Sequence, residues 1–440
     1  MAQSISVVIP ALNAERYLDR CLGALHGGTV RPHETIVVDD GSVDGTRQLA
    51  LNYGAIVLST GKSMGPSFAR NLGSKMATGK VLLFIDSDVL VAADTLEKFG
   101  NRFEKDASLD ALIGAYDTEP YCWGFLSQYK NLMHSFVHQT GSKHASTFWS
   151  GCGAIRTEIF QEHGGFDETF ERPAIEDIEL GYRMVHANRK IALDGSIQVK
   201  HLKCWTLKSI IETDIFHRGI PWTRLILRDH FMPNDLNLRM GQRVSVFLVF
   251  VLLALGFRMA AVHGLPLMFP LFAIVFWMLA RWWGELVFYS KPRRAHLLMA
   301  ALLTGLAATA YFFKMYGLIV PLLLTPALLL VRHRYRKNDS IQDWHRLVAL
   351  AYIAVSLGIS IFYIRSSPLL YACVGVSAAL IILNLRFYAF LFDNRGIAFM
   401  LSAILFNFLY HFYSGISFII GITNHFWDLQ SRKQSNQSSA

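Results

Sequence analysis

The first part of the chain alternates short apolar runs with segments of helical spacing. Apolar runs rich in β-branched residues end near Pro10, Asp39, Ser59 and Asp86, and amphipathic stretches separate most of them. This alternation predicts strand–helix–strand units, and therefore a parallel, doubly wound sheet. We expect a Rossmann-like α/β domain over residues 1–204.

The pattern changes beyond Arg243, where long and almost uncharged apolar runs begin. A membrane-spanning helix needs about 20 mostly apolar residues, and most of these runs reach or approach that length. We expect an all-α transmembrane domain of about seven helices over residues 244–424. Amphipathic interfacial helices should precede it at residues 205–243, and a polar tail should follow at residues 425–440.

The net charge of +9 does not indicate a nucleic-acid-binding protein, because of where the charge lies. Much of the excess stands in short loops between apolar runs, at residues 290–296, 332–337 and 385–396. Short basic loops stay on the cytoplasmic side of a membrane. Seven spans place these loops and the amino-terminal domain there together, and six spans are the alternative. The chain is therefore expected to be a multi-pass protein of the cell (inner) membrane.

The cysteines give no metal-binding or cross-linking pattern. There are five, they are scattered, and no CxxC occurs. We therefore expect neither a zinc ribbon nor a disulfide framework, in agreement with a domain that faces a reducing cytosol.

Polar residues stand where the predicted strands end. The turn at residues 10–13 follows the first strand, Asp39 and Asp40 end the second, and Asp86 and Asp88 end a later one. Ligands of such sheets bind at the carboxyl ends of the strands. Paired carboxylates are tolerable there if a divalent cation lies between them and a polyphosphate, and Mg²⁺ and Mn²⁺ prefer oxygen ligands. The alternative for any one of these ends is an ordinary turn; their convergence favours a site.

The motifs of this half resemble those of family 2 glycosyltransferases with the GT-A fold. The resemblance covers about residues 4–205 and rests on motifs in family order: VVIPALN, VVDDGSVDGT, GPSFARNLG, VLLFIDSDV, GGFDETF and IEDIELGYR. It implies a GT-A nucleotide-sugar-binding domain whose donor is a UDP- or GDP-linked sugar. It also implies a divalent cation, Mg²⁺ or Mn²⁺.

The resemblance also implies site residues. Asp88 and His201 would hold the metal, although His201 has the alternative of an ordinary histidine at a strand end. Residues 10–13 and Asp39 would hold the base and ribose. Gly151 and Gly153 would let the backbone approach the sugar, with a simple loop turn as the alternative. The expected donor-binding residues are Pro10, Asn13, Asp39, Asp40, Arg70, Asp86, Gly151 and Gly153.

The expected catalytic pair is Glu176 and Asp177, at the start of a helix in IEDIELGYR. In inverting members the aspartate of this pair is the general base that deprotonates an acceptor hydroxyl. The alternative is that both acids only complement the helix dipole. If the acceptor is a polyprenyl phosphate, its nucleophile is already an anion, and Asp177 would position groups.

The segment at residues 205–243 interleaves aromatic and basic residues, as helices at a membrane surface do. Arg218 and Trp222 are the expected acceptor or interface residues, but their spacing departs from the QxxRW signature of processive synthases. We therefore expect transfer of a single sugar to a lipid-linked or membrane-associated acceptor. A processive polysaccharide synthase is the alternative, and a transporter with a regulatory nucleotide-binding domain is an alternative of another class.

Overall fold

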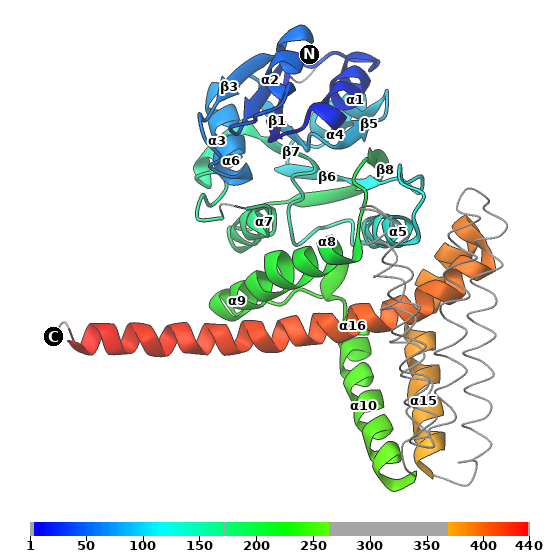
Figure 1. Cartoon of the computed structure of the whole chain (residues 1–440). Helices are drawn as coiled ribbons and strands as arrows, with labels where there is room; N and C mark the ends of the chain where they lie inside the picture. Colours follow the sequence, from blue (N-terminus) through cyan, green and yellow to red (C-terminus); the bar gives the residue numbers. More distant parts are fainter. Residues whose placement is uncertain (1–3, 171, 264–367, 439–440) are drawn as a thin grey trace, which may run out of the picture. The chain divides into compact units, whose positions relative to one another are not determined.

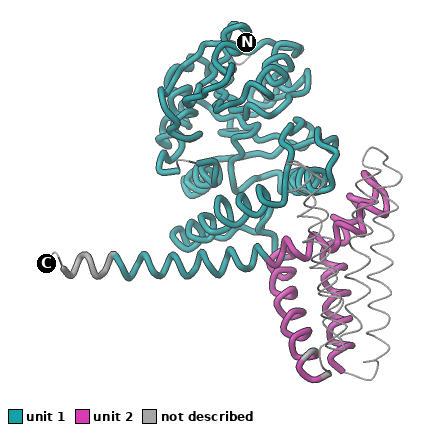
Figure 2. The backbone as a smooth tube through the Cα atoms, viewed as in Figure 1, with its two compact units in different colours: residues 1–240, 413–440 teal, residues 241–412 magenta. Residues whose placement is uncertain are grey.

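The computed structural model describes residues 4–170, 172–263 and 368–438. The chain forms two compact units, one of Met1–Met240 with Tyr413–Ala440 and one of Gly241–Phe412 (Figure 2). The spans expected between residues 264 and 367, and the basic loops at 290–296 and 332–337, lie outside the described residues. They stay predictions.

An eight-stranded sheet forms the centre of the first unit, in the order β3-β2-β1-β4-β7-β6-β8-β5 (Figure 1). Strands β1 to β4 are parallel neighbours, as the sequence predicted. The expectation of an all-parallel sheet is wrong beyond β4, because β7 is antiparallel to both β4 and β6, and β5 is antiparallel to β8. The strands are β1 (Ile5–Ala11), β2 (Glu34–Asp39), β3 (Ile56–Ser59), β4 (Val81–Ile85), β5 (Val89–Val91), β6 (Ala111–Tyr116), β7 (Cys152–Arg156) and β8 (Ile191–His201).

Helices cover both faces of this sheet, because successive side chains of a strand point to opposite faces. Val7 and Leu83 are buried with α1 and α4 on one face, whereas Val8 and Phe84 are buried on the other with α6 and α7. The helices of this part are α1 (Glu15–His26), α2 (Thr46–Asn52), α3 (Pro66–Met76), α4 (Thr95–Lys105), α5 (Phe125–Gln139), α6 (Thr157–Glu162) and α7 (Glu176–His186).

The expected amphipathic segment is helical. It contains α8 (Leu207–Ile211), the π-helix η1 (Glu212–Gly219), α9 (Ile220–Asp229) and the short η2 (Leu236–Leu238). Thr206 starts α8 by accepting a hydrogen bond from the Ser209 amide. Turns of π-helix are rare and often occur at functional sites.

The second unit is helical where it is described. It contains α10 (Met240–His263), α15 (Pro368–Leu383) and the first part of α16 (Leu385–Ser438), which is kinked at Gly396 with φ 76°. Two stretches, Met240–Met259 and Leu385–Ser431, are long and apolar enough to cross a membrane. This weakly supports the expected membrane domain, and the number of spans stays a prediction.

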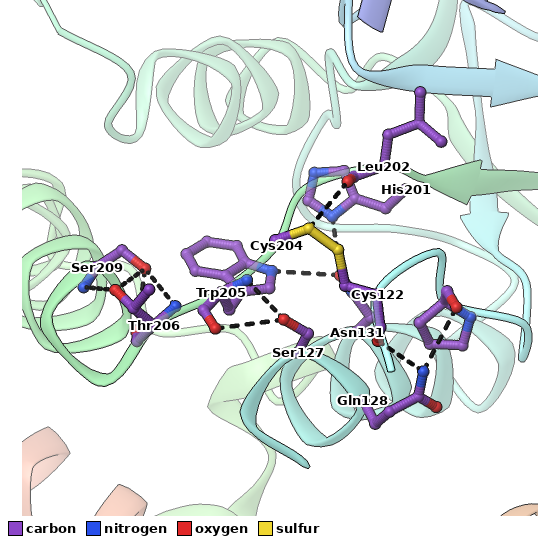
Figure 3. The surroundings of a disulfide bond; sticks show 11 residues. Cys122, Ser127, Gln128, Asn131, His201, Leu202, Cys204, Trp205, Thr206 and Ser209 are labelled. Atoms are coloured by element: carbon purple, nitrogen blue, oxygen red, sulfur yellow. Dashed lines mark hydrogen bonds between the residues drawn. A yellow bond between two sulfur atoms is a disulfide. The ribbon is translucent and has the colours of Figure 1, made fainter. Parts of the chain in front are cut away.

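The expectation of no disulfide is wrong, so the cysteines give no support to a domain that faces a reducing cytosol. Cys122 and Cys204 are bonded, with their Cα atoms 5.5 Å apart and a sequence separation of 82 (Figure 3). Parallel pairing of β6 with β8, which sets Tyr116 opposite Val199, carries the two following segments to the same edge of the sheet. Spacing along the chain could not reveal this pairing, because it depends on two strands that are far apart in sequence.

Candidate active site

The polar ends of β1, β2 and β4 lie at one edge, because β1 pairs in parallel with both other strands. Pro10 lies inside β1 opposite Val38, and Ala11 lies opposite Asp39. The sheet therefore brings the expected donor-binding turns together, as their positions at strand ends predicted.

Asn13 and Asp39 hold the loops that follow β1 and β2. The Asn13 side-chain oxygen accepts a hydrogen bond of 2.9 Å from the Val43 amide, and the Asn13 amide donates to Ser42 Oγ at 2.9 Å. Asp39 Oδ1 accepts from the Ser42 amide, also at 2.9 Å. Asn13 has a φ of 49°, which Asn tolerates better than most residues. These bonds connect both loops at the strand ends.

Asp40 has a different environment from its neighbour. Its carboxylate is buried, and each oxygen accepts two hydrogen bonds from the loop that precedes α3. The donors are the Thr60 and Ser63 hydroxyls and the Met64 and Gly65 amides, at 2.8–3.0 Å. The side chain therefore holds this loop, and we do not include it among the proposed donor ligands.

Arg70 joins the DSD stretch, Asp86-Ser87-Asp88, to the start of α7. Its guanidinium donates to Asp86 Oδ1 at 2.7 Å and to Glu176 Oε1 at 2.8 Å. Arg70 and Glu176 are both buried, with side chains about 5% exposed, whereas Asp86 keeps 35% of its side chain exposed. The other Glu176 oxygen accepts from the Ala174 amide. Glu176 is thus an ion-pair partner within the fold, and Asp86 is the accessible end of the bridge.

Asp177 lies next to this bridge. Its Oδ2 accepts from the Ser150 amide at 3.1 Å and is 3.3 Å from the Ser150 hydroxyl, while its Oδ1 accepts from the Ile178 amide. Burial of the carboxyl, and secondarily the nearby Glu176 charge, raise the pKa of Asp177 to about 6. A carboxylate with this pKa is ionised at pH 7 and is a better proton acceptor than an ordinary aspartate.

Asp88 and His201 face each other at the end of the sheet, where β5 pairs with β8. His201 Nε2 is 3.5 Å from Asp88 Oδ2. His201 Nδ1 is 2.8 Å from Asn131 Oδ1, which also accepts from the Trp205 indole N–H at 3.3 Å (Figure 3). An indole N–H can only donate, so the Asn131 atom that it contacts is the side-chain oxygen. Since this oxygen is an acceptor, His201 Nδ1 must carry the proton of the hydrogen bond between them. A neutral His201 therefore presents the Nε2 lone pair to Asp88.

This arrangement fits a divalent cation in part. A histidine ligand of a metal typically donates its other ring N–H to an oxygen acceptor, as His201 does. Asp88 and His201 supply two donors, and Mg²⁺ or Mn²⁺ sites usually take their remaining ligands from water and substrate phosphate. Among the described residues no cluster of three or more His, Cys, Asp or Glu side chains could hold a metal alone.

The two expected acceptor residues have separate surroundings. Arg218 of η1 is 3.4 Å from His134 Nε2, and its charge also acts on Asp177. No carboxylate in the described part of the chain lies at ion-pair distance from Arg218. Trp222 of α9 donates to the Tyr182 hydroxyl at 3.0 Å and packs against α7. Trp222 therefore attaches α9 to α7, the helix that begins with Glu176 and Asp177.

Gly151 and Gly153 lie in and beside β7, where no strand was expected. The Gly151 carbonyl accepts from the Asp86 amide at 3.3 Å. A Cβ atom on Gly153 would lie 2.3 Å from the Trp149 carbonyl, so the strand needs glycine there for packing. Gly151 borders the DSD stretch, whereas Gly153 is a packing residue of the sheet.

The sequence did not reveal Lys203 or the aromatic cluster beside it. Lys203 follows His201, and its Nζ lies 4.2 Å from the centre of the Trp205 ring. Burial lowers the pKa of Lys203, and the charge of Asp88 opposes that effect. Tyr116 stacks on His201 and contacts Trp149 edge-on. No local pattern marks these residues, because they come from separate segments that meet only in the fold.

Residues 6–164 match the sequence model of the family described as "Glycosyl transferase family 2". The match supports a family 2 glycosyltransferase domain over these residues, in agreement with the resemblance of their motifs.

Curated relatives are also glycosyltransferases. Validoxylamine A glucosyltransferase of Streptomyces hygroscopicus subsp. limoneus is 28% identical over 224 residues, which cover 42% of this chain and 48% of the relative. O-antigen chain rhamnosyltransferase RfbN of Salmonella typhimurium is 26% identical over 235 residues, 50% of this chain and 74% of the relative. The match spans about half the length of the first relative.

Among solved structures, S. aureus TarS 1-349 in complex with UDP-GlcNAc is similar, with 18% identity and a TM-score of 0.40. The match covers 75% of this chain and 91% of that chain. A likeness with this TM-score carries no weight for function.

Proposed function

We propose that this chain is a membrane-bound, metal-dependent glycosyltransferase. It moves one sugar, with inversion, from a UDP- or GDP-linked donor to a lipid-linked or membrane-associated acceptor. The observation that carries the proposal is the bridge from Asp86 through Arg70 to Glu176, because it brings the expected donor site and the expected base into one place. A family 2 domain over residues 6–164 supports the reaction class.

The donor lies along the strand ends. Asn13 and Asp39 order the loops around the nucleoside, and Asp86 and Asp88 face the ribose and diphosphate. A Mg²⁺ or Mn²⁺ ion held by Asp88 and His201 would stabilise negative charge on the departing diphosphate. Lys203, beside Asp88, adds positive charge at the same place.

The acceptor approaches from the side of Asp177. Its oxygen attacks the anomeric carbon opposite the diphosphate, the bond from that carbon to the diphosphate oxygen breaks, and the nucleoside diphosphate departs. For a hydroxyl acceptor, Asp177 takes the proton, and its pKa of about 6 suits that role. For a polyprenyl phosphate acceptor there is no proton to remove, and Asp177 positions groups.

The membrane part of the proposal rests on two described apolar stretches and on the sequence beyond them. A multi-pass arrangement in the inner membrane, with the catalytic unit on the cytoplasmic side, keeps the acceptor close to the site. The basic loops expected from the sequence support this orientation.

The test uses membranes from cells that express the full chain, with membranes that carry Asp88→Ala as the control. Each is incubated with a panel of radiolabelled UDP- and GDP-sugars, and lipid-extractable label is separated by chromatography. We expect one donor to label a lipid product carrying a single sugar, and only in the parent membranes. Ladders of longer products would support a processive synthase instead. Equal labelling in both membranes with every donor would contradict the proposal.

A further inference from the structure

The last part of α16 belongs to the catalytic unit. Residues from Tyr413 onward group with Met1–Met240, whereas the earlier part of the same helix belongs to the second unit (Figure 2). Within the catalytic unit, this part of α16 runs alongside η1 and α9 and in the same direction. Later residues of η1 and α9 contact later residues of α16. Asp214, Gly219, Thr223 and Arg224 meet successive residues of α16, namely Tyr413, Ser417, Gly421 and Asp428.

A buried polar network lies where α16 first contacts the catalytic unit, at Tyr413. The Tyr413 hydroxyl donates to Asp214 Oδ2 at 2.7 Å, and Lys130 Nζ lies 2.7 Å from both oxygens of the same carboxylate. The side chains of Lys130 and Asp214 are only 2% and 8% exposed. Since a buried charge without its partners is costly, this network ties Tyr413 firmly to α5 and η1.

After Tyr413, small residues let α16 approach η1 and α9 closely. A Cβ atom on Gly219 would lie 2.3 Å from Ser417 Oγ, and one on Gly421 would lie 2.5 Å from Thr223 Cβ. At the far end Arg224 forms an ion pair with Asp428. The helix is therefore held to the catalytic unit from Tyr413 to Asp428.

The opposite side of this helical segment carries an apolar stripe. From Ile419 onward its members recur at steps of three and four residues, the spacing of one helix face. Ile419 is 52% exposed and Phe426 is 56% exposed, which are large values for such side chains. The stripe consists of Phe418, Ile419, Ile422, Phe426 and Leu429.

We propose that residues 413–431 form an interfacial helix, with one face on the catalytic unit and the apolar stripe in the surface of the lipid bilayer. An amphipathic helix rich in Phe and Trp suits the headgroup region. The segment is the last part of the stretch Leu385–Ser431, whose length and composition suit a membrane. It cannot itself cross the bilayer, because both its ends contact charged groups of the catalytic unit.

The placement of this helix restricts how often the chain crosses the membrane. If both Met240 and Tyr413 lie on the catalytic side, the chain between them crosses the membrane an even number of times. This agrees with the alternative of six spans. The inference does not depend on which sugar is transferred, or on whether the chain is a transferase.

Topology is tested with cysteines added one at a time to the full chain, in a Cys373→Ser background that keeps the two buried cysteines and the disulfide. Ser431→Cys reports on the end of the proposed helix, and Asn101→Cys, exposed on α4, reports on the catalytic unit. A membrane-impermeant maleimide is applied to intact spheroplasts and to inverted vesicles. We expect both cysteines to react in the same preparation and to be protected in the other, with the unmodified background as blank. Reaction of the two cysteines in opposite preparations overturns the proposal.

Lipid contact is tested with nitroxide labels on the full chain in liposomes of stated composition, phosphatidylethanolamine with phosphatidylglycerol. Phe426→Cys carries the label on the stripe, and Asn424→Cys, exposed and polar, is the matched control. We expect position 426 to collide more with oxygen than with a polar nickel chelate, and position 424 to show the reverse. Water-like collisions at position 426 overturn lipid contact. Protection of position 426 from both reagents also overturns it, in favour of a protein partner.

Discussion

Asp40 and Asp88 both follow the carboxyl ends of strands in one sheet, but their carboxylate oxygens make different contacts. Both oxygens of Asp40 are occupied by the loop before α3. Asp88 Oδ2 instead faces His201 Nε2 at 3.5 Å. An acidic residue at a strand end therefore indicates a ligand only when the fold leaves its lone pairs free.

The largest effect is expected at Asp88. Asp88→Ala removes one of two proposed metal ligands, so transfer should fall to near background while the protein still inserts in the membrane. Radiolabelled transfer at saturating donor measures it, with Ser87→Ala as the neighbouring control. EDTA should reproduce the loss in the parent, and added Mn²⁺ or Mg²⁺ should reverse it. Full activity in chelator would show that Asp88 does not act through a metal.

Asp177→Asn should have the next largest effect. With a hydroxyl acceptor the chemical step should slow by at least about 10²-fold, because the proton acceptor is gone. The base is the ionised form, so parent activity should fall as the pH drops below about 6, and the variant should lose that dependence. Single-turnover rates from pH 5 to 8 measure both.

Glu158→Gln is the matched control for Asp177→Asn, since Glu158 is an exposed acid in the first turn of α6. If both variants keep the parental rate, Asp177 only complements its helix. A much smaller loss at Asp177 alone would point to a lipid phosphate as acceptor.

A smaller effect is expected at Asn131, which contacts the proposed metal ligand His201. Asn131→Ala removes the oxygen that orients His201, and loss of such a partner typically weakens metal binding about 10- to 100-fold. The Mn²⁺ concentration for half-maximal activity should rise by that factor, while the rate at saturating Mn²⁺ changes little. The exposed Asn101→Ala should leave both values unchanged. An unaltered Mn²⁺ requirement in Asn131→Ala would mean that His201 is not a metal ligand.

Asp40→Asn should affect stability and leave the chemistry almost unchanged. An amide cannot accept from all four donors, and a buried donor without a partner costs about 1–3 kcal/mol. The midpoint of thermal unfolding of the detergent-solubilised chain should fall, with transfer at low temperature close to parental. A normal midpoint with weakened donor binding would instead make Asp40 a ligand and remove the contrast with Asp88.

The sequence by itself determined the first half of the sheet. Strands β1 to β4 and the helices between them follow from local apolar runs and their spacing. The motifs identified Asp86, Asp88 and Asp177 as candidate site residues. These features are readable because each depends on residues close together in the chain.

Other features depended on the tertiary structure. Contacts between distant segments set the antiparallel direction of β7 and the bond between Cys122 and Cys204. They also give Asp40 and Asp88 different partners. Tyr413 is the extreme case, since it completes the Asp214 network from 199 residues away. A pattern along the chain specifies which side chains are available, but a hydrogen bond depends on which atoms the fold brings within about 3 Å of each other.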